Sequence, residues 1–149
     1  GTYPIIRIIS HSHGGNVALY LARMKQPQDK ELIIESLVLL ACPVQRRSLQ
    51  NIYDPMFKKI YSLYSSLDIT QVLAPQRPRY RPFSSKQFPK DPKLIQAKIK
   101  RNGHALLHTA FTKKQFCQAL PAVLAELDSI HNEMYDKIYS DGHDLIVEI

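Results

Sequence analysis

The sequence predicts an α/β domain whose mostly parallel sheet of about four strands is flanked by helices. Short aliphatic or β-branched runs alternate along the chain with segments of helical periodicity, an order typical of parallel sheets. The chain has 149 residues, of which 44% are hydrophobic and 22% charged. A chain of this length can bury one core. Its longest apolar stretches, 37–42 and 119–127, are shorter than the roughly 20 residues that a membrane-spanning helix needs.

The first three elements follow directly from the amino-terminal sequence. Residues 5–9 (IIRII) form a short β-branched run ended by polar and glycine residues, which predicts a buried strand. Apolar residues then recur with helical spacing between Val17 and Met24, which indicates a helix. A second apolar run, 36–42, stops at Pro43 and predicts another strand. Together these elements make a strand–helix–strand unit.

The later elements are predicted from alternation and from a helix start signal. Residues 58–64 (KKIYSLY) and 94–100 (LIQAKIK) alternate, which predicts a third strand and a fourth strand near the sheet edge. Residues 112–115 have capping-box spacing, and apolar residues recur with helical period over 116–130. Pro121 falls inside this helix, so we expect either a kink or a separate first turn. We expect a domain over 1–131 and a tail over 132–149.

The positive charge of the chain is concentrated in residues 76–101, which hold nine Lys and Arg against the single acid Asp91. The prolines of 75–92 predict an extended surface connection, so 75–101 is interpreted as a basic, proline-rich connection. It is either a solvated insertion or a surface for anionic membrane or another acidic partner. We expect no nucleic-acid partner. No RNA-binding motif accompanies the aromatic residues of the segment, Tyr80, Phe83 and Phe88.

The stretch 10–19 (SHSHGGNVAL) carries the strongest chemical signal. A serine between a strand and a helix, with small residues on both sides, can stand on a sharp turn that exposes its Oγ at the carboxyl edge of the sheet. Ser12 holds that position. The backbone N–H of His13, at the start of the following helix, would then be one donor of an oxyanion hole.

This stretch resembles the nucleophile elbow of the α/β-hydrolase superfamily, with Ser10 where the usual pattern has glycine. The resemblance extends over residues 4 to 130, because the element order is that of the superfamily's carboxyl-terminal half. It implies a partial α/β-hydrolase fold and a serine hydrolase, lipase-like or esterase-like, that acts on small-molecule or lipid carboxylic esters.

In the superfamily, the acid and then the histidine of the triad follow the serine along the chain. Asp68 follows the third predicted strand and is the expected acid, with Asp54 as the fallback. His104 and His108 follow the fourth strand. We expect His104 to be the general base, with His108 as the alternative, because spacing alone does not choose between them.

The resemblance also implies that strands preceding residues 5–9, and the second oxyanion donor, are missing from this chain. We therefore expect a fragment or remnant that is inactive alone or is completed by another chain or by self-association along an open sheet edge. The alternative is a non-catalytic α/β domain that docks onto anionic membrane or protein through its basic connection.

Other chemistries receive little support. Cys42 and Cys117 each stand in an apolar run, which predicts two buried thiols rather than a disulfide or a zinc knuckle. His11 and His13 form an HxH pair, but residues 14–16 (GGN) supply no further metal ligand. We expect neither a metal nor another cofactor. No signal-peptide pattern is visible, so a cytoplasmic location is expected.

Overall fold

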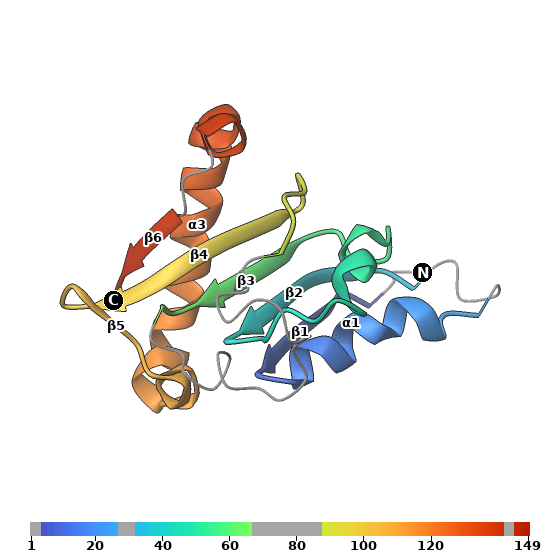
Figure 1. The fold of residues 1–149 in the computed structure, drawn as a ribbon, viewed down its shortest axis with the longest axis horizontal. Helices are drawn as coiled ribbons and strands as arrows, with labels where there is room; N and C mark the ends of the chain where they lie inside the picture. Colours follow the sequence, from blue (N-terminus) through green and yellow to red (C-terminus); the bar gives the residue numbers. More distant parts are fainter. Residues whose placement is uncertain (1–3, 27–31, 67–87, 142–144) are drawn as a thin grey trace.

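The computed structural model describes residues 4–26, 32–66, 88–141 and 145–149, without the side chains of 134–141. Its elements succeed one another as a parallel α/β fold (Figure 1). In chain order they are β1 (Ile6–His11), α1 (Gly14–Met24), β2 (Ile34–Leu40), η2 (Leu49–Tyr53), β3 (Ile60–Tyr64), β4 (Leu94–Arg101), β5 (His104–Ala105), η3 (His108–Thr112), α3 (Lys114–Asp141) and β6 (Leu145–Glu148).

The sheet has six strands, and β1, β2, β3 and β4 lie side by side in parallel. These four correspond to the four expected strands, so the predicted α/β class is confirmed. Two further strands flank β4: β6 runs parallel to it and β5 antiparallel. Lys100 pairs with both Ala105 and Glu148, so β5 and β6 lie on opposite edges of β4. The short strand β5 therefore continues the sheet on the β3 side, beyond the end of β3.

Helices cover both faces of the sheet because side chains alternate along each strand. In β2, Leu37 and Leu39 join the core beneath α1, whereas Val38 and Leu40 join the core beneath α3. In α1, Ala18 and Leu19 pack against the first of these cores. The second core contains Phe116, Leu120, Val123 and Leu127 of α3. Figure 1 shows α1 alongside β1 and β2, and α3 across β3 and β4.

The expected division between a domain ending at residue 131 and a tail over 132–149 is wrong. α3 runs unbroken from Lys114 to Asp141 with Pro121 inside it, and β6 then pairs with β4. Leu145 and Val147 are buried in the core beneath α3. The four-residue strand is too short to give a periodic signal, but the sheet edge and the core hold it in place.

Two local expectations about α3 also differ from the structure. Thr112 belongs to the preceding helix η3, where its hydroxyl donates to the Thr109 carbonyl at 3.0 Å, and α3 begins only at Lys114. Cys42 is buried as expected, but Cys117 is exposed. An apolar run on a surface helix contains outward-facing positions, and Cys117, directly after the buried Phe116, occupies one of them.

The strand β1 forms one edge of the sheet, where within the described residues it pairs with β2 alone. Nearby apolar side chains are open to solvent, Ile5 being 72% exposed and Ile9 62% exposed. Completion of the sheet along this edge by another chain stays a prediction. No helix among the described residues combines the length and apolar character needed to cross a bilayer.

Candidate active site at the carboxyl edge of the sheet

Ser12 occupies a sharp turn between the end of β1 and the start of α1. Its φ is 55°, in the left-handed region that residues with a side chain rarely adopt. The Ser12 N–H donates to the Leu40 carbonyl at 2.9 Å, which fixes the turn against the end of β2. Strained backbone of this kind persists only where the surrounding structure holds it in place, and it recurs at functional positions. The sharp strand–turn–helix connection expected at Ser12 is therefore present.

Small residues around Ser12 allow the helix and the strands to approach closely. A Cβ on Gly15 would lie 2.5 Å from Cys42 Sγ, closer than atoms tolerate. A Cβ on Gly14 would lie 3.9 Å from Ser10 Cβ, an ordinary contact. The Ser10 hydroxyl also donates to the Val38 carbonyl at 3.1 Å. Ser10 therefore fits at its position with ordinary contacts, whereas Gly15 has no room for a side chain.

A buried polar network ties the start of α1 to the loop after β2. The Asn16 side chain donates to the Pro43 carbonyl at 2.8 Å and accepts from the Ser48 hydroxyl at 2.5 Å. Both side chains are buried, Asn16 being 4% exposed and Ser48 0%. Gln45 in the same loop donates to His13 Nδ1 at 3.3 Å. Sequence reasoning missed this network, although an asparagine directly after two glycines on an otherwise apolar helix was its visible signal.

The backbone around His13 has the arrangement expected of an oxyanion donor. His13 is the first flanking residue of α1, with φ −61° and ψ −22°. Turn bonds occupy the amides of Gly15 and Asn16, which donate to the Ser12 and His13 carbonyls. Among the described residues no hydrogen bond uses the His13 N–H. A free amide at a helix start favours an adjacent negative charge.

The structure brings His108, and not His104, to the elbow. The His11 and His108 rings are 4.5 Å apart between centroids, and His11 Nε2 lies 3.3 Å from the His108 carbonyl oxygen, to which it can donate. Since His11 directly precedes Ser12, His108 is next to the elbow. The contacts described include no hydrogen bond from Ser12 Oγ to an imidazole nitrogen. The two histidines of the HxH pair have separate partners, because His13 contacts Gln45.

His104 lies farther out, on the β4–β5 hairpin. It is paired with Arg101, and the strand ladder places Ala97 of β4 level with His11. The His104 backbone is therefore about 13 Å farther along the strand direction than His11 and about 10 Å to its side. A general base must come within about 3 Å of the proton it takes. In this arrangement His104 does not meet Ser12.

The two candidate acids have different outcomes. Asp68 lies outside the described residues. Asp54 lies at the opposite edge of the sheet, beside the start of β2, where the Ile34 N–H donates to the Met56 carbonyl at 2.7 Å. The seven residues of β2 separate that edge from the elbow by about 20 Å, so Asp54 is not brought to Ser12.

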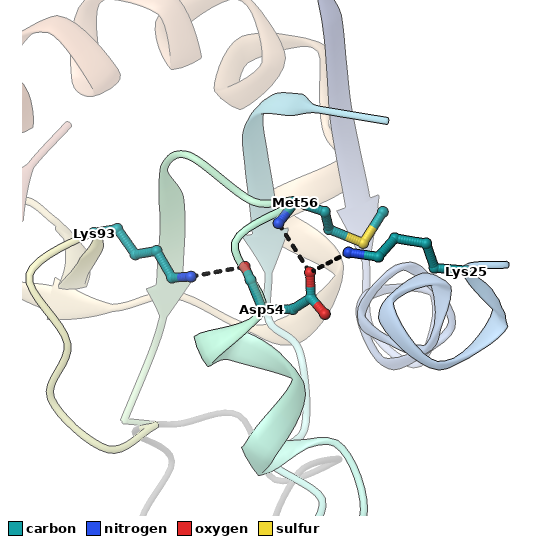
Figure 2. Close-up of polar contacts among 4 residues, drawn as sticks. All are labelled: Lys25, Asp54, Met56 and Lys93. Carbon is teal, nitrogen blue, oxygen red and sulfur yellow. Dashed lines mark hydrogen bonds and ion pairs between the residues drawn. The ribbon is translucent and has the colours of Figure 1, made fainter. Parts of the chain in front are cut away.

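Asp54 has a structural role instead (Figure 2). Its carboxylate pairs with Lys25 Nζ at 3.3 Å and accepts from the Met56 N–H at 2.9 Å, while its backbone carbonyl accepts from Lys93 Nζ at 2.8 Å. Burial lowers the pKa of Lys93, against the opposing influence of Asp91 and Asp54. Asp54 therefore joins the end of α1 to the start of β4.

The thiol near the elbow is not a competing nucleophile. Burial raises the pKa of Cys42 to about 12, with a hydrogen bond from the Asn16 backbone acting in the opposite direction. The thiolate is the reactive form of cysteine, so Cys42 stays protonated and inert at neutral pH.

Comparison with protein-family models, with curated proteins and with solved structures found no match for this chain.

Proposed function

We propose that this chain carries the nucleophile of a serine hydrolase that acts on carboxylic esters of small-molecule or lipid type. The observation that carries the proposal is Ser12, held at φ 55° between β1 and α1. A left-handed serine costs about 1–2 kcal/mol relative to ordinary backbone. Ala41 and Asn102 share this conformation, but of the three only Ser12 stands between a strand and the start of a helix, where a nucleophile is raised above the sheet edge.

In the proposed mechanism, Ser12 Oγ attacks the ester carbonyl while an imidazole accepts its proton. We assign His108 as this base in preference to His104, because only His108 contacts the residue that precedes Ser12. The imidazolium returns the proton to the departing alkoxide, and water then releases the acyl group from Ser12. The His13 N–H stabilises the oxyanion, and Asp68 is the acid that we propose to orient the imidazole.

A fluorophosphonate probe tests the assignment, because it phosphonylates an activated serine without needing substrate. We expect an adduct on Ser12, located by peptide mass spectrometry, that is lost in Ser12→Ala. Removing a general base costs about 10²–10⁴ in rate, so His108→Ala is expected to label at least about a hundredfold more slowly. His104→Ala and the exposed control Ser129→Ala should label like the parent.

The same experiment can overturn the proposal. A folded chain that forms no adduct at Ser12 contradicts it. If that chain also binds anionic vesicles in a salt-sensitive way, the non-catalytic docking domain replaces the hydrolase. If His104→Ala labels about a hundredfold more slowly and His108→Ala labels like the parent, His104 is the base.

A further inference from the structure

A recess separate from Ser12 opens at the far end of β4. Its volume is about 380 Å³, and it lies between the β4–β5 hairpin and the segment that leads into α3. Its walls include Arg101, His104, Leu106, Leu107, Ala110 and Lys113. The volume is within the range of small-ligand sites, about 300–1,000 Å³. The carboxyl ends of parallel strands are also the usual ligand-binding edge of open α/β sheets.

The hairpin beside the recess has a defined shape. Asn102 and Gly103 have φ values of 49° and 74°, as the two central residues of a type I′ turn require. The turn sets Arg101 directly opposite His104 in the antiparallel pair. Side chains of directly opposed residues stand on the same face, about 5 Å apart at Cβ. The Arg101 guanidinium and the His104 imidazole therefore extend from the same face of one hairpin.

The residues that line the recess include two basic side chains, Arg101 and Lys113, and no acidic one. Arg101 Nη1 donates to Gln115 Oε1 at 3.0 Å, a neutral partner. The carboxylate of Glu148 accepts from the Gly103 N–H at the hairpin tip. Within the described part of the chain no ion pair joins Arg101 or Lys113 to an acid. Two basic side chains, Arg101 and Lys113, thus line the recess together with the His104 imidazole.

Apolar residues also line the recess. Leu106 is buried, whereas Leu107 is 62% exposed beside it. A ligand that covers an exposed leucine removes apolar surface from water, which is favourable. A guanidinium forms charge-assisted hydrogen bonds to carboxylate or phosphate oxygens. We propose that this recess binds an amphipathic anion, a short alkyl chain that carries one carboxylate or phosphate group.

This binding site does not depend on the proposed hydrolysis. It is nevertheless close to it, because Leu107 and Thr109 line the recess while His108 between them contacts His11. An alkyl carboxylate is also the class of acid that hydrolysis of an ester releases. A bound acid would therefore contact the chain segment that carries His108, the proposed base.

Binding can be measured by amide chemical-shift titration with octanoate, octyl phosphate, octan-1-ol and acetate. We expect octanoate or octyl phosphate to shift the amides of Leu106, Leu107 and Ala110. Octan-1-ol and acetate should each bind at least about tenfold more weakly, since either lacks one half of the recognition. The same affinities are expected in Ser12→Ala, so failure here is distinguishable from failure of the proposed hydrolase.

Variants of the basic and apolar lining residues make the proposal falsifiable. The double variant Arg101→Gln, Lys113→Gln should weaken octanoate binding at least about tenfold, as should Leu107→Asp, which adds a repelling charge at an exposed position. Lys58→Gln, whose lysine pairs with Glu35 at 2.9 Å, is the matched control and should not change it. Equal binding of octan-1-ol, no effect of the double variant, or no binding would overturn the proposal.

Discussion

Cys42 Sγ lies 2.5 Å from the position that a Cβ on Gly15 would occupy. Cys42 Cβ and Leu39 Cδ2 are also close to that position, at 2.9 Å and 3.0 Å. Gly15 thus lies against side chains at and just after the end of β2, so the start of α1 packs closely on them. This contact fixes the direction in which the helix leaves the Ser12 turn.

Gly15→Ala is therefore expected to destabilise the fold. The added methyl group has no space between Cys42 and Leu39, and overpacking of this kind costs about 1–3 kcal/mol. Urea denaturation monitored by circular dichroism measures the free energy of unfolding. An unchanged midpoint in Gly15→Ala would contradict the close packing described for this site.

Gly14→Ala is the matched control, since its Cβ would meet only Ser10 Cβ at 3.9 Å. We expect a change below about 1 kcal/mol for this variant. Cys42→Ala removes the atom that Gly15→Ala meets most closely. The double variant Gly15→Ala, Cys42→Ala should therefore lose less stability than the sum of its single changes.

The backbone conformation of Ser12 predicts an unusual order of stability between two variants. Ser12→Gly should be more stable than Ser12→Ala by about 1 kcal/mol. A left-handed residue with a Cβ costs about 1–2 kcal/mol, which exceeds the extra entropy of about 0.5–1 kcal/mol that glycine loses on folding. Thermal and urea unfolding of the two variants tests this order.

The exposed helical residue Val17 provides the comparison for that pair. In ordinary helical backbone alanine is favoured over glycine by about 1 kcal/mol, so Val17→Ala should be more stable than Val17→Gly. If Ser12 and Val17 variants follow the same order, Ser12 does not adopt the left-handed conformation.

Asp54→Ala separates a structural acid from a catalytic one. The change removes the ion pair with Lys25 and the hydrogen bond from the Met56 N–H, so we expect a loss of about 1–2 kcal/mol in unfolding free energy. Fluorophosphonate labelling of Ser12 should proceed at the parent rate below the unfolding transition. A labelling defect in fully folded Asp54→Ala would restore Asp54 as the acid.

Tyr61 predicts how stability depends on alkaline pH. Burial raises the pKa of Tyr61 above its ordinary value of 10.0, and the hydrogen bond to Asp128, 2.7 Å long, raises it further. The folded state then holds the phenol proton more tightly than the unfolded chain. The resulting stability is complete below about pH 10 and is lost as the pH rises above it.

Tyr61→Phe should therefore flatten the decline of unfolding free energy between about pH 10 and 11.5, while costing about 1 kcal/mol at pH 8 through the lost hydrogen bond. Tyr53, which is 43% exposed, provides the control variant Tyr53→Phe, whose pH profile should match that of the parent. Identical slopes for the parent and Tyr61→Phe would contradict the prediction.

The fold class and the tight turn at Ser12 could be predicted because their signals are local. The runs that became β1 and β2 are bounded by turn residues, and the small residues around Ser12 already indicate a tight turn. The choice between His104 and His108 is not local. It depends on β5 and η3, which carry the chain from the hairpin tip back to His11, and neither two-residue strands nor single helical turns leave a periodic signal.

The role of Asp54 was equally hidden from the sequence. An aspartate after a strand predicts a site only when it follows the carboxyl end of that strand closely. Here η2 carries the chain back along β2, so that Asp54 reaches the opposite edge and meets Lys25. Sequence order records which strand comes before an acid, but not the edge to which the connection returns it.

The two helices also differ in the hand of the connections they make. From β1 to β2 and from β4 to β6 the chain steps in the same direction across the sheet, yet α1 and α3 cover opposite faces. The two crossovers therefore have opposite hands, and one of them is left-handed, against the right-handed form of about 98% of such connections. A strictly right-handed path with this strand order would place both helices on one face. The change of hand is what lets a sheet whose strands follow chain order bury both of its sides.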